Sequence, residues 1–410
     1  MKKKDILFLC QFFYPEYVSS ATLPFDTALA LTKAGYTVDA LCGYPKEYLR
    51  EESVPDRETV QGIGIRRLHY IQCDRKQKIG RLINYISFTA SALLHLGKLR
   101  NYHTVVVYSN PPILPIVAAW AKKLFGCRLV FVAYDLYPEI AVASHSLRDS
   151  SIIAKVMRYV NRNVYGCADR VVALSSEMKD FISLHRPIAE NKICVIPNWY
   201  EDKGLCKKSE TKFASSYNGK FVVSYLGNMG IIQDMDTILD AIRALREEPD
   251  IEFLFAGHGK KMEELKQIVS DENLSHVKIH DFLHGQDYED ALTVSDGALV
   301  SIREGATGLC CPSKTYGYMM RGIPLLAIIG PSDIAEDAMA GAGVQVRNGD
   351  GIGLAKAILD MKNNPDKTKN MRKISREVYL KKYTTTIATK QYIQLFQELD
   401  QEPINVRTRK

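Results

Sequence analysis

The sequence has no run of 18 apolar residues and no pair of cysteines in C-x-x-C spacing. A helix that spans a bilayer needs about 20 predominantly apolar residues, so no membrane-spanning helix is predicted. The nine cysteines are scattered and odd in number, and the adjacent pair Cys310 and Cys311 suits no ordinary disulfide. This usage indicates reduced thiols in a cytoplasmic protein, and it disfavours both a disulfide framework and a metal site.

Two further absences exclude whole classes of protein. No G-x-G-x-x-G follows the first predicted strand, so a dinucleotide-dependent oxidoreductase is disfavoured and no cofactor is expected. The sequence has no basic motif interleaved with aromatic residues, so no nucleic-acid partner is expected. The opening, MKKKDILFLCQFFYPE, starts with basic residues, but its apolar run is short and is broken by Gln11, Tyr14 and Pro15. It predicts a first buried strand rather than a signal peptide.

The net charge of +7 is unevenly distributed. Residues 1–190 hold 25 Lys and Arg against 17 Asp and Glu, whereas residues 191–410 hold 29 against 30. The positive excess therefore lies wholly in the first half of the chain. Such asymmetry predicts an acidic partner for that half, which leaves nucleic acid, anionic lipid or a phosphorylated substrate to be distinguished by other features.

Strand and helix signals alternate along the chain, which predicts an α/β fold with parallel sheets covered by helices. A length of 410 residues suggests two domains. We predict a Rossmann-like domain at 1–198, a second one at 199–383, and a last helix with its tail at 384–410 that crosses back to the first domain. The polar stretch at 201–212 is typical of a linker. Two doubly wound sheets facing across a cleft bind ligands at the carboxyl ends of their strands.

The first candidate motif is YLGNMG at 225–230, which follows the first strand of the second domain. Gly227 and Gly230 would let backbone N–H groups approach a phosphate, and a helix is predicted soon afterwards. The alternative is ordinary turn geometry, for which glycines are common between a strand and a helix.

The second candidate motif is PSK at 312–314. Ser313 is predicted to be a helix N-cap, which would place Lys314 in the first helical turn. A cation there opposes the helix dipole by about 0.3–1 kcal/mol, so Lys314 is expected to await an anion. The alternative is an exposed lysine tolerated in salt water. Because both motifs follow strands of one predicted domain, a single diphosphate could contact both.

The third candidate motif is DLYPE, in which Asp135 and Glu139 come just after the buried strand VFVAYD. A carboxylate in that place can accept a hydrogen bond from a substrate hydroxyl. The alternative is that Asp135 caps a helix. His145 nearby is a weaker candidate, since a lone histidine more often has a structural role.

Taken together and in order, these segments resemble the family 4 retaining glycosyltransferases, whose two Rossmann-like domains form the GT-B arrangement. The resemblance covers nearly the whole chain and is strongest for the bacterial surface-polysaccharide branch with DL(Y/W)PE and PSK motifs, which includes transferases of amino-deoxy sugars. It rests on the following segments: FFYPEYVSSATLPFDTALALTKAGYTVDALCG, VIPN at 195–198, SYLGNMG with DTILDAI, FAGHGKKMEEL, SDGALVSIRE and PSKTYGYMMRGIPLLA.

The resemblance implies a nucleotide-sugar donor in the second domain, an acceptor on the first, transfer with retention, and no metal at the diphosphate. By family habit the nucleotide is uridine diphosphate. Gly227, Asn228 and Gly230 match the family's phosphate loop. Ser313 and Lys314 match the helix that faces the diphosphate, where positive charge stabilises the departing nucleoside diphosphate. Asp135 and Glu304 complete the predicted catalytic set.

The sequence also departs from the family pattern. Asn228 and Gln233 stand where most members have Arg and Lys, so Lys314 and Arg303 are expected to supply the positive charge. The two family glutamates fall on Leu309 and Gly317. Glu304, five residues early, is the candidate replacement for the first of these glutamates.

On the acceptor side, the family's small loop residues are Ser19 and Ser20 here. With Glu139 and His145 they form the predicted acceptor side of the site, for a glycan or a polyprenyl-diphosphate-linked saccharide.

The stretch 77–104, together with Lys76 just before it, mixes apolar residues such as Ile79, Ile86 and Leu94 with basic residues that include Arg81. Such a helix can lie on an anionic membrane, where each basic residue adds about 1 kcal/mol. The alternative is an ordinary helix packed on the sheet. The sequence thus predicts a transferase for capsule or O-antigen polysaccharide, peripheral on the inner face of the cell membrane. The alternative is an inactive GT-B partner or nucleotide-binding subunit of a transferase complex.

Overall fold

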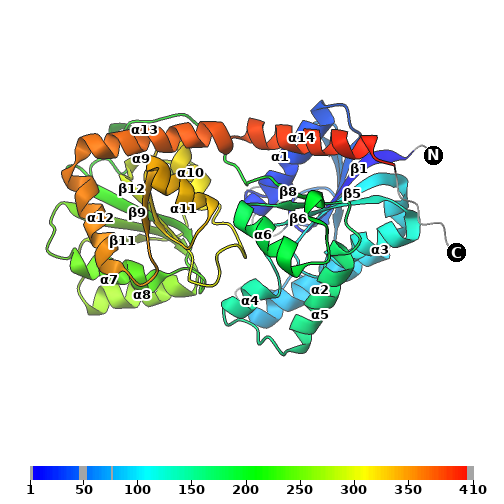
Figure 1. Cartoon of the computed structure of the whole chain (residues 1–410), viewed down its shortest axis with the longest axis horizontal. Coiled ribbons are helices and arrows are strands. Elements are labelled where there is room, and N and C mark those ends of the chain that lie inside the picture. Colours follow the sequence, from blue (N-terminus) through cyan, green and yellow to red (C-terminus); the bar gives the residue numbers. More distant parts are fainter. Residues whose placement is uncertain (1–2, 46–52, 75–76, 404–410) are drawn as a thin grey trace.

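The computed structural model describes residues 3–45, 53–74 and 77–403. It shows two domains side by side, each with a mostly parallel sheet between layers of helices (Figure 1). The alternation of strands and helices in the sequence therefore predicted the fold class correctly, as two doubly wound α/β units. No helix among these residues is both long and apolar enough to cross a membrane.

The sheet of the first domain has the order β3-β4-β2-β1-β5-β6-β7-β8, and only the edge pair β3–β4 is antiparallel. Its strands are β1 (Lys4–Cys10), β2 (Val38–Gly43), β3 (Arg57–Val60), β4 (Ile63–Leu68), β5 (Tyr102–Tyr108), β6 (Arg128–Ala133), β7 (Arg170–Ala173) and β8 (Ile193–Val195). Its helices are α1 (Ser19–Lys33), α2 (Lys78–Leu94), α3 (Pro115–Phe125), α4 (Glu139–Ala143), α5 (Ile152–Tyr165) and α6 (Ser176–His185).

Strand β6 shows why these segments form central strands. Its sequence, RLVFVA, is buried along its whole length. Leu129 and Phe131 join the apolar cluster on one face of the sheet, and Val130 and Val132 join the cluster on the other. A parallel strand covered by helices on both faces needs apolar residues at every position, which is what this run provides.

The second domain has the sheet order β11-β10-β9-β12-β13-β14, all parallel. Its strands are β9 (Phe221–Asn228), β10 (Ile251–His258), β11 (Val277–His280), β12 (Gly297–Ser301), β13 (Leu325–Ile328) and β14 (Gly343–Val346). Its helices are α7 (Met235–Ala244), α8 (Lys260–Asp271), α9 (Gln286–Val294), α10 (Lys314–Met320), α11 (Asp333–Asp337), α12 (Gly351–Asn363) and α13 (Pro365–Lys382). The strand order reverses between β9 and β12, which makes the ends of these two strands the natural ligand site.

The last helix, α14 (Thr385–Gln401), runs along the top of Figure 1 from the second domain to the first and packs on α1. Near its end the Asp400 carboxylate accepts hydrogen bonds from the Tyr36 hydroxyl at 2.8 Å and from Arg128 Nη1 at 3.2 Å. The predicted return of the last helix to the first domain is confirmed. The end of the predicted tail, 404–410, lies outside the described residues.

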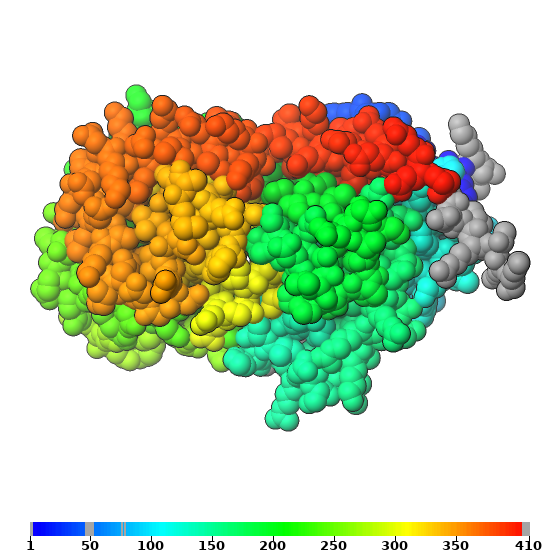
Figure 2. Space-filling model, viewed as in Figure 1, coloured from blue at the N-terminus to red at the C-terminus, as the bar shows by residue number. Residues whose placement is uncertain are grey.

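The two domains touch through backbone groups as well as side chains, and Figure 2 shows their surfaces in contact. The Leu136 N–H donates to the Leu309 carbonyl at 2.8 Å. The Ser176 N–H donates to Asp333 Oδ2 at 2.8 Å, and the Asp333 N–H donates to Glu177 Oε2 at 3.2 Å. The N-terminal end of each helix, α6 and α11, thus donates an N–H hydrogen bond to an acidic side chain of the other domain. A negative charge is favourable at the positive end of a helix.

Candidate active site

The glycine loop 227–230 lies at the carboxyl end of β9, beside the end of β10. Gly227 has φ +119°, a conformation that favours glycine. A Cβ at Gly227 would lie 3.6 Å from Lys314 Cε, so the loop and this lysine are in direct contact. The Met229 N–H donates to the His258 carbonyl at 2.7 Å, which fixes the loop against β10.

Lys314 is the first residue of α10, as predicted, and it reaches over the glycine loop. Its Nζ donates to the Asn228 carbonyl at 3.3 Å and lies 3.4 Å from the centre of the Tyr225 ring. In the described part of the chain no carboxylate lies within ion-pair distance of this ammonium group. Burial lowers the pKa of Lys314 well below its usual range. The site therefore holds a half-buried cation that the protein itself leaves without a counter-ion.

Ser313 was expected to cap α10, and that prediction is wrong. The residue has helical dihedral angles, φ −58° and ψ −22°, and its side chain makes no capping hydrogen bond. A capping serine needs extended dihedral angles to turn its hydroxyl back onto the helix. The Ser313 side chain is instead exposed beside Lys314.

The loop after β12 brings a second cation to the same edge of the sheet. The Arg303 N–H donates to the Ile232 carbonyl at 2.8 Å, which ties this loop to the end of the glycine loop. Arg303 Nη2 lies 3.4 Å from Asp236 Oδ2, so its charge is partly neutralised, unlike that of Lys314. Glu304 is exposed and forms no ion pair with any described residue.

The positions of the missing family residues are closed to a ligand. Leu309 and Gly317 are both buried, and a Cβ at Gly317 would lie 3.4 Å from the Tyr288 hydroxyl and 3.6 Å from the Tyr200 ring. Two tyrosines thus occupy the space that a glutamate at 317 would need. Gln233 is also buried, and its Oε1 has no hydrogen-bond partner, which is rare for a buried polar atom and marks a place where a ligand or water belongs.

Asp135 lies across the domain boundary from these groups, directly after β6. Its backbone N–H donates to Ser109 Oγ at 3.1 Å, and it bridges to Cys310 in the second domain. Its carboxylate makes no hydrogen bond or ion pair within the ranges that the structure describes, and burial raises its pKa to about 6. It does not cap α4, because the N-cap of that helix is Pro138. The structure therefore leaves this carboxylate free to meet a hydroxyl.

The remaining predicted acceptor residues are more dispersed. Glu139 lies in the first turn of α4 and forms an ion pair with Arg186 Nη2 at 2.5 Å, so its charge is already used within the protein. His145 is exposed just after α4, with φ +49°. Ser19 and Ser20 were expected to be loop residues, but they form the first turn of α1.

Two residues with clear roles in this arrangement were not predicted. Ser109 Oγ accepts hydrogen bonds from the N–H groups of both Tyr134 and Asp135, at 3.0 and 3.1 Å. Tyr225 provides the ring beneath Lys314. Ser109 follows β5, the strand next to β6, so its place at the carboxyl edge of the sheet was the signal that could have identified it.

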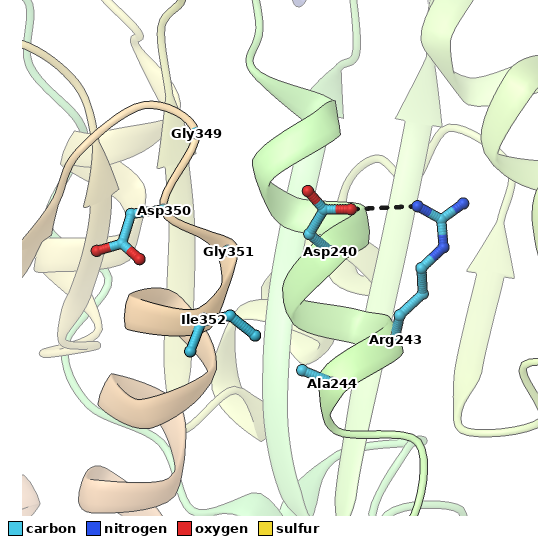
Figure 3. A pocket seen from close by; sticks show the side chains of 7 residues that line it. All are labelled: Asp240, Arg243, Ala244, Gly349, Asp350, Gly351 and Ile352. Atoms are coloured by element: carbon cyan, nitrogen blue, oxygen red, sulfur yellow. Dashed lines mark hydrogen bonds and ion pairs between the residues drawn. The ribbon is translucent and has the colours of Figure 1, made fainter.

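A separate open hollow of about 470 Å³ lies between α7 and the start of α12 (Figure 3). It is lined by Asp240, Arg243, Ala244, Gly349, Asp350, Gly351 and Ile352. Its arginine is already paired with Asp240 at 3.2 Å and with Glu272 at 2.6 Å. None of the predicted site residues lines this hollow, and its cation is neutralised, so the candidate site is the edge that carries Lys314.

Comparison with known families agrees with this arrangement. A model of the glycosyl transferase 4-like domain matches residues 25–199, and a model of group 1 glycosyl transferases matches residues 207–378. The chain belongs to the GT-B glycosyltransferases. The first match ends at residue 199, directly after the VIPN segment at 195–198, and the second contains both the glycine loop and Lys314.

Individual relatives are distant. WbjE of Pseudomonas aeruginosa, named a probable glycosyltransferase, is 26% identical over 237 residues, which cover 57% of this chain and 59% of WbjE. WcaI of Escherichia coli, provisionally named a colanic acid biosynthesis glycosyl transferase, is 22% identical over 252 residues, with 59% and 61% covered. The chain thus spans about three-fifths of the length of these curated relatives. Among solved structures, Anabaena HepE in complex with UDP-glucose has a TM-score of 0.72 at 16% identity, covering 96% and 100%, and so shares the fold.

Proposed function

We propose that this protein transfers a sugar from a uridine-diphosphate sugar to a glycan or lipid-linked saccharide, with retention, in the synthesis of a bacterial cell-surface polysaccharide. The observation that carries the proposal is the ammonium group of Lys314. It is half-buried over the glycine loop, its pKa is lowered by burial, and it has no carboxylate partner among the described residues.

On the donor side, each part of the site has a role in stabilising a departing diphosphate. The backbone at Gly227 to Gly230 would approach the phosphates, and Lys314 and Arg303 would supply positive charge. Negative charge grows on the diphosphate as the glycosidic bond breaks, so a cation held in place before the reaction lowers the barrier. The diphosphate would also restore the full charge of Lys314, whose pKa burial now depresses.

On the acceptor side, Asp135 would accept the hydrogen bond of the attacking hydroxyl. Its pKa of about 6 leaves it ionised at neutral pH yet close enough to that pH to share a proton. The hydrogen bond from Leu136 to Leu309 holds this residue's loop against the second domain. This contact supports an acceptor bound between the domains, where donor and acceptor groups can meet.

The comparisons support the substrate class without fixing the sugar. HepE is described as binding UDP-glucose and WcaI is named for colanic acid biosynthesis. These names support a UDP-sugar donor and a role in polysaccharide synthesis. A polyprenyl-diphosphate-linked or glycan acceptor and a place of action on the cytoplasmic face of an anionic membrane complete the proposal. Retention of the anomeric centre follows from the resemblance to family 4 glycosyltransferases.

A second candidate function is a GT-B partner that binds a nucleotide without turnover. One observation favours it: the positions of both family glutamates, Leu309 and Gly317, are apolar and buried. Glu304 is the available carboxylate on the same loop, and its exposure leaves it able to move toward a donor. Activity of a Glu304→Gln variant distinguishes the two functions, because only a transferase would lose turnover while keeping nucleotide binding.

The test is a thermal-shift panel of nucleoside diphosphates and nucleotide sugars, followed by measurement of released UDP with candidate acceptors. A ligand present at 100 times its Kd stabilises a protein by about 2.7 kcal/mol, which is readily measured as a rise in Tm. We expect UDP and one UDP-sugar to raise the Tm. If no nucleotide sugar does so, the donor site is wrongly assigned.

A further inference from the structure

An apolar and basic surface covers one side of the first domain, away from the cation over the glycine loop. It is formed by α2, α3 and α5, of which α3 packs against both of the others. In Figure 1 these helices lie along the lower side of the first domain, and in Figure 2 the region of α4 and α5 projects from the body of the protein. We name this surface the docking face, and its large exposed apolar side chains are Ile79, Ile86, Leu94, Trp120, Leu124, Ile152, Ile153, Val156 and Tyr159.

Helix α5 is the most sharply two-sided of the three helices. Its inward positions Ala154, Met157 and Val160 are buried. One turn apart on the other side, Ile152 is 79% exposed and Val156 is also exposed. The helix therefore has an apolar stripe on each side, and only one of them is covered by the protein.

Helix α2 repeats this pattern. Its inward residues Phe88 and Ala92 belong to the core, whereas Ile79 is 74% exposed and Leu94 is 87% exposed. The helix packs on the first domain, as the second interpretation of the stretch 77–104 expected, and it also presents apolar side chains outward. Lys76, one of its predicted basic residues, lies outside the described residues.

The charge of the docking face has one sign. The sequences of α2, α3 and α5 contain seven Lys or Arg residues and no Asp or Glu. Some of these cations are used internally, since Arg158 pairs with Asp149. Arg81, Lys155 and Arg162 are exposed and form no ion pair with other described residues. Apolar side chains interleaved with free cations are the pattern of a helix that lies at the surface of an anionic membrane.

The docking face is also connected to the acceptor carboxylate. From α5, Asn161 Nδ2 donates a hydrogen bond to the Tyr137 carbonyl, two residues after Asp135. Through this bond α5, one of the three helices of the docking face, holds the loop that carries Asp135.

We propose that the docking face binds the anionic surface of a lipid bilayer, with α5 as its central contact, and so presents the Asp135 loop to a saccharide on a lipid carrier. The proposal deepens the proposed function and rests on it for the lipid-linked acceptor. A second copy of this chain fits the surface poorly, because two such faces would bring the exposed cations Arg81, Lys155 and Arg162 of one copy against those of the other.

The test is flotation of the full-length protein with vesicles, in the absence of any sugar donor. We expect binding to vesicles of phosphatidylethanolamine with phosphatidylglycerol, loss of that binding at high salt, and little binding to phosphatidylcholine vesicles. The variant Ile152→Ser/Lys155→Ala should lower the partition coefficient about fivefold through the lysine. Loss of the isoleucine side chain should lower the partition coefficient by a further factor of about ten or more.

The matched control is Ile352→Ser/Lys356→Ala on α12, at the opposite end of the protein in Figure 1, where both side chains are also exposed. It should bind vesicles like the wild type. Both variants should keep the Tm shift caused by UDP, which shows that they are folded. Three results would overturn the proposal: equal vesicle binding by the two variants, equal binding of the wild type to neutral and anionic vesicles, or a wild type that stays in solution as a dimer. Vesicle binding without any donor binding would support the docking face and contradict the transferase function instead.

Discussion

Replacement of Lys314 by methionine separates binding of the diphosphate from folding. The methionine keeps the apolar stem and removes the ammonium group, which lies 3.3 Å from the Asn228 carbonyl and 3.4 Å from the Tyr225 ring centre. A hydrogen bond to a charged group contributes about 1.5–3 kcal/mol. The Kd for UDP should therefore rise roughly tenfold to 150-fold, since about 1.4 kcal/mol corresponds to a factor of ten.

Folding stability should change far less. Loss of the cation–π contact with Tyr225 costs about 0.5–2 kcal/mol. Removal of the half-buried cation from the first turn of α10 offsets this loss by about 0.3–1 kcal/mol through the helix dipole. It also removes the free-energy cost of holding the ammonium group partly away from water. Because the folded-state pKa of Lys314 is lowered, the native state binds fewer protons than the unfolded state between that pKa and 10.5. Wild-type stability should rise with pH in that window, and the variant should lose this rise.

The assay is titration calorimetry with UDP, together with urea unfolding at several pH values. The exposed Lys356 on α12 provides the control, because Lys356→Met should leave the Kd unchanged. The reasoning is refuted if Lys314→Met binds UDP as tightly as the wild type. It is refuted equally if the loss of folding free energy accounts for the loss of binding, since Lys314 would then be a structural residue.

Three further results are expected. With Asp135→Asn, kcat/KM should fall sharply and should no longer decline below about pH 6. The free energy of unfolding should rise by about 1–3 kcal/mol at pH 8 and hardly change at pH 4, because the raised pKa reflects the cost of the ionised form and the folded protein holds this carboxyl group protonated at pH 4. Unfolding curves at both pH values check the sign, and a pH–rate profile unchanged by the substitution would remove Asp135 from the chemistry. Gly317→Glu should destabilise the protein by about 3–5 kcal/mol, because it buries a carboxylate against Tyr288. The control Gly317→Ala should fold normally, because its Cβ makes only ordinary contacts. A stable glutamate variant would show that this position opens to the cleft. Asp333→Asn should weaken the contact with the Ser176 N–H and increase the radius of gyration measured by small-angle scattering, and an unchanged radius would show that other contacts hold the domains together.

The sequence predicted the features that depend on periodicity and on strand ends. Continuous apolar runs such as β6 identified the parallel strands, and Asp135, just after that run, lies at the carboxyl edge of the first sheet. Lys314, at the start of α10, reaches the glycine loop at the carboxyl end of β9. Local propensity was a poorer guide at helix ends. Ser313 is a residue type that often caps helices, but its dihedral angles are already helical and its side chain makes no capping hydrogen bond.

Contacts between segments far apart in the chain could not be predicted in the same way. The hydrogen bonds that Ser109 accepts next to Asp135 depend on β5 and β6 lying side by side, and the closure of position 317 depends on Tyr200 and Tyr288 meeting there. No local pattern encodes such meetings, since each depends on the packing of whole elements. The sequence shows that the family glutamates are absent. It does not show that two tyrosines fill the space which a glutamate at position 317 would need.

Lys314 and Asp135 share an electrostatic property that links the two halves of the site. The pKa of the lysine is lowered and that of the aspartate is raised, so both shifts favour the neutral form, and in both cases burial is the cause. Charged residues buried for structural reasons are paired with an opposite charge, as Glu289 and Arg321 are at 2.8 Å. These two are not paired with each other or with any other described residue. A diphosphate at Lys314 and a hydroxyl at Asp135 would each supply the missing partner, so binding of the two substrates should restore both charges where the reaction requires them.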